Sequence, residues 1–121
     1  MKITPKTLKE ILSRWLPPLI WAGVIFAFSS QHQITVSQLF FWDFLAKKAA
    51  HLAEYAILFA LIFRATRGKW SSSWLLLLAY AVFDEFHQSL VPGRIATPLD
   101  VGFDLMGAGI ASYTIWKLQK R

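Results

Sequence analysis

The stretch Ser71–Val91, SSSWLLLLAYAVFDEFHQSLV, decides the fold class of this chain. The part from Trp74 to Phe83 is apolar around the whole circumference of a helix, which suits a helix surrounded by lipid. Asp84, Glu85 and Gln88 then follow near one end of the stretch. The pattern predicts a helix that crosses a membrane and carries polar side chains to one membrane face, because ionisable groups at that depth need a partner or a wet cavity.

The composition of the whole chain supports the same environment. Its 121 residues are enough for one domain, residues 1–121, and 55% of them are hydrophobic while only 17% are charged. Soluble domains carry about 25% charged residues. Six tryptophans in so short a chain also favour a membrane, since indole rings prefer its interfaces.

Charge and cysteine content exclude several functional classes. The net charge is +6, but the basic residues form short clusters between apolar segments, so nucleic-acid binding is not expected. The chain has no cysteine, which excludes disulfides, thiolate catalysis and cysteine-ligated metals.

Three further apolar segments accompany the first, giving spans at about residues 15–31, 47–66, 71–91 and 98–118. Thr4-Pro5 is typical of a helix start. In residues 6–15 the apolar side chains fall on one helix face and the polar ones elsewhere, which predicts a short helix on the membrane surface. The aromatic connector Gln31–Ala46 is expected at the interface. The predicted fold is therefore all-α, an integral membrane four-helix bundle with a short N-terminal amphipathic helix.

Two alternatives stay open at this point. Several uninterrupted apolar runs are shorter than the roughly 20 residues that cross a bilayer, so a soluble four-helix bundle is one alternative. The first segment also has features of a cleavable signal peptide. Helices that are apolar on every side argue against the first alternative, and Pro17-Pro18 at the segment's start argues against the second.

The basic residues predict an orientation. Ten of them lie at the N-terminus, in the connector after the second span and at the C-terminus, against Lys47, Lys48 and Arg94 on the other side. By the positive-inside rule, both termini are expected in the cytoplasm.

The remaining polar residues share the outer face on this topology. Residues three or four positions apart lie on one helix face, so each helix offers a polar stripe. The candidates are Ser30, Gln31, Lys48, His51, Glu54, Tyr55, Asp84, Glu85, Gln88, Arg94, Asp100 and Asp104. One shared outward pocket is the economical arrangement. Ion pairs that lock the helices, such as Arg94 with Asp84 or Lys48 with Glu54, are the structural alternative.

Individual residues allow different roles. His51 suits a general base, a nucleophile, a metal ligand or a hydrogen bond between helices. Thr97-x-x-Asp100 matches a capping box, whereas Asp104 lies beyond the cap. Glu85 lies about 100° around the helix from Asp84, so the two are not expected to point at the same spot. His32 and His87 are expected to be peripheral, and the small residues of the last span are expected to allow close packing. Those small residues are Gly102, Gly107, Ala108, Gly109, Ala111 and Ser112.

These residues, in this order, resemble the VanZ-like family of small polytopic bacterial membrane proteins. The resemblance covers most of the chain and rests on the motifs FSSQ (28–31), K-x-x-H-x-x-E-Y (48–55), D-E-x-x-Q (84–88), P-G-R (92–94) and the spaced Asp100, Asp104 and Gly107. It implies a membrane protein whose founding relative is associated with low-level teicoplanin resistance. Broader comparisons liken the family to enzymes acting on lipid head groups.

The expected function is phosphoester transfer or hydrolysis on a lipid or lipid-linked head group of the cell envelope. His51 would act as base or nucleophile, oriented by Asp84 or Glu54, with Glu85 and Gln88 beside it. Lys48, Tyr55, Arg94, Ser30 and Gln31 would bind the substrate. Asp100 and Asp104 offer oxygen ligands for a divalent cation, although no motif identifies a cofactor. A non-enzymatic lipid- or glycopeptide-binding protein that affects antibiotic susceptibility and a small transporter are the rival functions.

Overall fold

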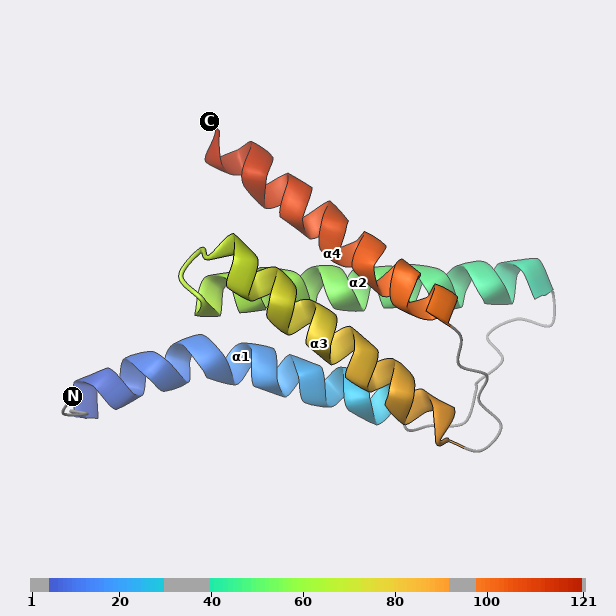
Figure 1. The fold of residues 1–121 in the computed structure, drawn as a ribbon, viewed down its shortest axis with the longest axis horizontal. Coiled ribbons are helices and arrows are strands. Elements are labelled where there is room, and N and C mark those ends of the chain that lie inside the picture. Colours follow the sequence, from blue (N-terminus) through green and yellow to red (C-terminus); the bar gives the residue numbers. More distant parts are fainter. Residues whose placement is uncertain (1–4, 30–39, 92–97, 121) are drawn as a thin grey trace.

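Four helices in antiparallel succession make up the computed structural model, which describes residues 5–29, 40–91 and 98–120. They are α1 (Pro5–Ser29), α2 (Phe40–Ala65), α3 (Trp70–Ser89) and α4 (Pro98–Gln119), and the described residues contain no strand. Figure 1 shows α1 and α4 on opposite sides, with α2 and α3 between them. The all-helical class and the four helices predicted from the sequence are confirmed.

The helix bounds differ from the prediction in two places. α1 is continuous from Pro5, so the expected N-terminal amphipathic helix is not a separate element but the first turns of α1. The helix continues through Pro17 and Pro18. α2 begins at Phe40, so the aromatic segment before Lys47 is the start of a helix rather than part of a connector.

The core is narrow and centres on α2, which packs against each of the other three helices. Its buried members are large apolar side chains and small alanines at helical spacing, from all four helices. They are Ile25, Tyr55, Leu58, Phe59, Ile62, Phe63, Leu77, Ala81 and Ala108. Among the described residues, one helical stretch, Pro5–Phe28, is long and apolar enough to cross a membrane.

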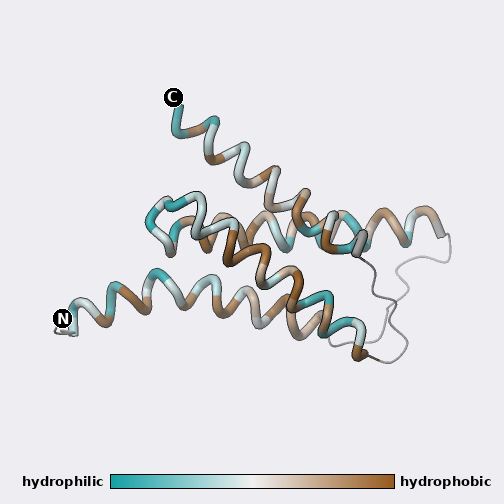
Figure 2. Tube along the Cα trace, viewed as in Figure 1, coloured by the Kyte–Doolittle hydropathy of each residue, from teal (hydrophilic) through white to brown (hydrophobic). Residues whose placement is uncertain are grey.

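Polar residues collect at the two ends of the molecule. The end of α1, the start of α2, the end of α3 and the start of α4 lie towards one end of the molecule (Figure 1). The two chain termini and the α2–α3 turn lie at the other end. Hydrophilic residues mark both ends in Figure 2, while the middle of α3 is hydrophobic. Because successive helices run in opposite directions, the first half of α2, the last turns of α3 and the first turns of α4 meet at one end, where the site lies.

Candidate functional site

α2 supplies a polar stripe that runs from its third turn towards the middle of the bundle. Lys48, His51 and Tyr55 recur every three or four residues, so they share the helix face that α3 and α4 cover. Tyr55 is fully buried, while His51 and Lys48 are partly buried. The stripe therefore passes from the rim of the bundle into its core.

His51 and Asp104 form the central contact of the site. The Nδ1 atom of His51 lies 3.1 Å from Oδ1 of Asp104, a distance suited to a ring N–H that donates to a carboxylate. Asp104 is only 1% exposed. The sequence had suggested Asp84 or Glu54 as the carboxylate that orients His51, and the contact with Asp104 on α4 corrects that assignment.

A close approach of α2 and α4 explains why these two residues meet. A Cβ atom at Gly107 would lie 2.2 Å from the backbone oxygen of Leu52, so the helices touch there through bare backbone. Leu52 is the neighbour of His51, and Gly107 lies about one helical turn after Asp104. The missing side chain at Gly107 therefore sets the spacing that brings His51 to Asp104.

Lys48 and Asp100 form a second pair, one turn nearer the rim. The Lys48 ammonium forms a salt bridge with the Asp100 carboxylate. It also lies 5.0 Å from the centre of the Phe103 ring and 5.5 Å from that of Phe44, within the range of cation–π attraction. Lys48 thus joins α2 to α4, whereas the alternative derived from the sequence paired it with Glu54.

Asp84 is the most deeply buried charged side chain of the site, with no exposed surface. Its Oδ2 atom accepts hydrogen bonds from the Tyr55 hydroxyl at 2.9 Å and from Gln88 Nε2 at 3.2 Å. Its Oδ1 atom is buried and has no hydrogen-bond partner among the described residues. A buried carboxylate oxygen without a partner is costly, so it marks a position for a donor that the described residues do not supply.

Glu85 adds a second such oxygen. Its Oε1 atom is buried and also lacks a hydrogen-bond partner within the described part of the chain. The charges of Asp100, Asp104 and Asp84 all act on this carboxylate. The angle between neighbouring helix positions had predicted separate directions for Asp84 and Glu85, yet both belong to one electrostatic environment. We use the name polar cluster for the residues Lys48, His51, Tyr55, Asp84, Glu85, Gln88, Asp100 and Asp104.

The comparison with known protein families matches residues 6–119 to VanZ/LLP1. The chain belongs to the VanZ/LLP1 family. This confirms the resemblance drawn from the ordered motifs, which lie within the matched range. Comparisons with curated proteins and with solved structures gave no match.

Eight of the twelve candidate site residues of this VanZ/LLP1 chain form the polar cluster, and Glu54, Ser30, Gln31 and Arg94 are not among them. The charge of Glu54 acts on His51, and the backbone oxygen of Glu54 accepts a hydrogen bond from Trp21 Nε1 at 2.9 Å. Ser30, Gln31, Arg94, His32 and Thr97 lie outside the described residues. His87, predicted to be peripheral, stacks on Phe26 with 4.1 Å between ring centres.

The metal hypothesis gains no geometric support from the part of the chain that the structure describes. No group of three or more histidine and carboxylate side chains there is arranged to hold a metal ion. The carboxylates of Asp100 and Asp104 contact Lys48 and His51 instead of sharing one partner. A divalent cation at this pair stays a prediction from the sequence.

Sequence reasoning missed how α1 is attached to the site end of this VanZ/LLP1 protein. The Tyr80 hydroxyl donates to the backbone oxygen of Ala22 at 2.5 Å, and Trp21 donates to Glu54. The ring of Tyr80 also lies beside that of Tyr55, with 6.1 Å between ring centres. These hydrogen bonds could have been anticipated from Trp21 and Tyr80 themselves. Each carries a polar group inside an apolar run, and the polar group of a buried tryptophan or tyrosine usually has a hydrogen-bond partner.

Proposed function

We propose that this protein is a membrane-embedded enzyme that transfers or hydrolyses the phosphoester of a lipid or lipid-linked head group in the cell envelope. The observation that carries the proposal is the partly buried His51–Asp104 pair, which lies in one cluster with two carboxylate oxygens that have no hydrogen-bond partner among the described residues. Membership of the VanZ/LLP1 family supports a membrane setting.

The outer surface of the helices also supports a membrane setting. Leu19, Leu75, Val82 and Ile110 lie well inside their helices, and each is more than half exposed. Large exposed apolar patches on a monomer mark contact with lipid or with a partner. α2, α3 and α4 carry the polar cluster, and a cavity filled by a head group would accommodate its charges.

His51 is the proposed general base. When its Nδ1–H donates to Asp104, Nε2 is the ring nitrogen left to take the proton of an attacking hydroxyl, as in other histidine–aspartate pairs. The oxygen of that hydroxyl forms a bond to phosphorus while the bond from phosphorus to the leaving oxygen breaks. The proton on Nε2 then passes to the leaving oxygen, which returns His51 to its starting state.

The other members of the cluster hold the head group. Lys48 has three N–H donors and uses one on Asp100, so the others are available to phosphate oxygens. Arg94, a prediction from the sequence, would share that role. The unpartnered oxygens of Asp84 and Glu85 would accept hydrogen bonds from hydroxyl or ammonium groups of the head group.

The test compares lipids from membranes of cells that produce the wild-type protein, His51→Gln or Asp104→Asn. His87→Gln is the matched control because the His87 ring stacks on Phe26 of α1 and is not a member of the polar cluster. We expect mass spectrometry to show a lipid product that disappears with His51→Gln and Asp104→Asn and persists with His87→Gln.

Folding of each variant is checked by thermal unfolding in detergent. If wild-type and folded His51→Gln membranes have the same lipid profile, the protein is not this enzyme. Retained binding of a head group by that variant would then favour the non-enzymatic lipid-binding function.

A further inference from the structure

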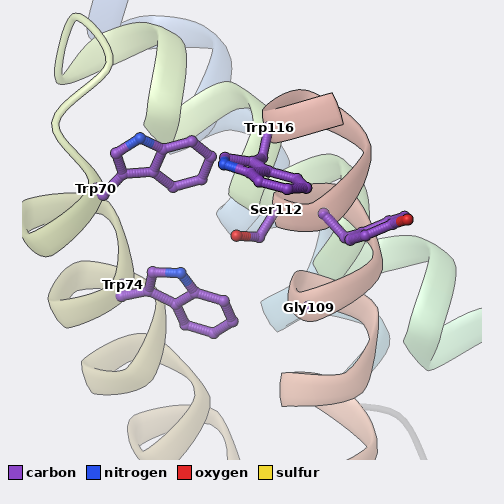
Figure 3. A pocket seen from close by; sticks show the side chains of 6 residues that line it. Trp70, Trp74, Gly109, Ser112 and Trp116 are labelled. Atoms are coloured by element: carbon purple, nitrogen blue, oxygen red, sulfur yellow. The ribbon is translucent and has the colours of Figure 1, made fainter. Parts of the chain in front are cut away.

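A groove lined by tryptophans lies between α3 and α4, at the end of the molecule opposite the polar cluster. It has a volume of about 570 Å³, within the range of roughly 300–1,000 Å³ found for small-ligand sites. We call it the tryptophan groove; its lining residues are Trp70, Trp74, Gly109, Ser112, Tyr113 and Trp116. Figure 3 shows Trp70 and Trp74 of α3 facing Trp116 and Ser112 of α4 across it.

The groove is open because α4 leans away from α2 and α3 towards its C-terminal end (Figure 1). Gly109 leaves further space, since a Cβ atom there would meet nothing within 4 Å. Along α3, Trp74 lies about 15 Å from Asp84, and along α4, Gly109 lies about 8 Å from Asp104, at 1.5 Å per residue. The groove extends from there towards the other end of the bundle and shares no lining residue with the polar cluster.

Lysines border the groove at the end of the bundle. Lys120 Nζ lies 3.9 Å from the ring centre of Trp116, and Lys117 Nζ lies 6.0 Å from that of Tyr113. Lys69, an exposed residue, directly precedes Trp70. An aromatic, apolar groove with positive charges at its mouth matches a ligand that has an apolar body and an anionic head.

We propose that the tryptophan groove binds an anionic phospholipid. An acyl chain lies between Trp74 and Gly109, and the phosphate lies near Lys117 and Lys120. Charge complementarity between the lysines and a phosphate favours this occupant. A second copy of the chain is the alternative that the experiment separates.

The experiment measures quenching of tryptophan fluorescence in nanodiscs by brominated phospholipids. Brominated phosphatidylglycerol or brominated phosphatidylcholine is added at the same fraction to unlabelled phosphatidylcholine. We expect stronger quenching by phosphatidylglycerol in the wild-type protein. The preference should fall about fivefold for each lysine replaced in Lys117→Gln and Lys120→Gln. Gly109→Leu, which fills the groove, should abolish it.

Matched controls distinguish binding in the groove from general attraction of anionic lipid to the positive charge at this end of the molecule. Lys6→Gln with Lys9→Gln removes two exposed lysines from α1 at the same end (Figure 1). Gly23→Leu adds a side chain where a Cβ also meets nothing within 4 Å. Both controls should keep the preference for phosphatidylglycerol.

Three results would overturn the proposal. Equal quenching by both lipids in the wild-type protein excludes an anionic lipid site. Loss of the preference in the Lys6 and Lys9 control indicates only attraction to a charged surface. A dimer of the wild-type protein that dissociates in Gly109→Leu assigns the groove to contact between copies.

Discussion

At the scale of single residues, the two oxygens of Asp84 have different surroundings. Oδ2 accepts two hydrogen bonds, from Tyr55 and Gln88, and Oδ1 accepts none within the described chain. The first arrangement is structural, because it holds α2 to α3. The second is a cost to the folded protein that a bound donor would remove.

Asp84→Asn separates these two roles. The amide oxygen can still accept from Tyr55 and Gln88, so the free energy of unfolding should change by less than about 1 kcal/mol. The amide nitrogen replaces one carboxylate oxygen as a donor. Formation of the lipid product should fall about tenfold to a hundredfold, since a hydrogen bond to a charged group contributes about 1.5–3 kcal/mol.

Thermal unfolding in detergent and the product assay are the two measurements. Tyr55→Phe is the comparison, because it removes one donor to Asp84 and should lower stability more than Asp84→Asn does. Full product formation by Asp84→Asn would contradict a ligand-binding role and assign Asp84 to structure alone.

At the scale of helices, one glycine controls the contact between α2 and α4. The small residues of α4 were all predicted to allow close packing, but of its three glycines only Gly107 makes a close approach. Gly107 meets the backbone of Leu52, whereas Gly102 and Gly109 face open space. Gly107 brings the helices together, and Gly109 leaves room in the tryptophan groove.

Gly107→Ala should therefore lower stability, and Gly109→Ala should not. The new Cβ at position 107 would lie 2.9 Å or less from three backbone atoms of Leu52, which cannot rotate away. Such overpacking costs about 1–3 kcal/mol. Thermal unfolding of both variants measures the difference. Equal stabilities would mean that α4 is not held against α2 at this point.

At the scale of the whole molecule, the two ends differ in charge. The four acidic residues of the polar cluster lie in the last turns of α3 and the first turns of α4 with one lysine, Lys48, whereas the helix ends at the other end of the bundle (Figure 1) carry basic residues without a described acidic cluster. Those basic residues are Arg64, Lys69, Lys117 and Lys120. With the positive-inside rule, this division predicts that the termini are cytoplasmic and the polar cluster is outside.

The absence of native cysteine makes this orientation directly testable. A cysteine at Gln38 should react with an impermeant thiol reagent in intact cells, and one at Lys69 should react only after the membrane is permeabilised. Labelling yields measured by mass shift give the result. The opposite pattern would place the polar cluster in the cytoplasm.

The amino-acid sequence alone determined the helical class, the four segments, the family and the set of polar residues at one end. These follow from hydrophobic patterning and local spacing, which depend on each helix separately. The position of His51 on the same face as Tyr55 is an example, because the 3.6-residue period places residues four apart together.

Only the tertiary structure decided which residues become partners. Helical spacing gives the direction of a side chain about its own helix, but not the register or the distance between two helices. Those depend on packing, here on the contact of Gly107 with Leu52, which pairs His51 with Asp104 instead of Asp84 or Glu54. The tryptophan groove has the same origin, since its two walls belong to helices whose separation no local pattern encodes.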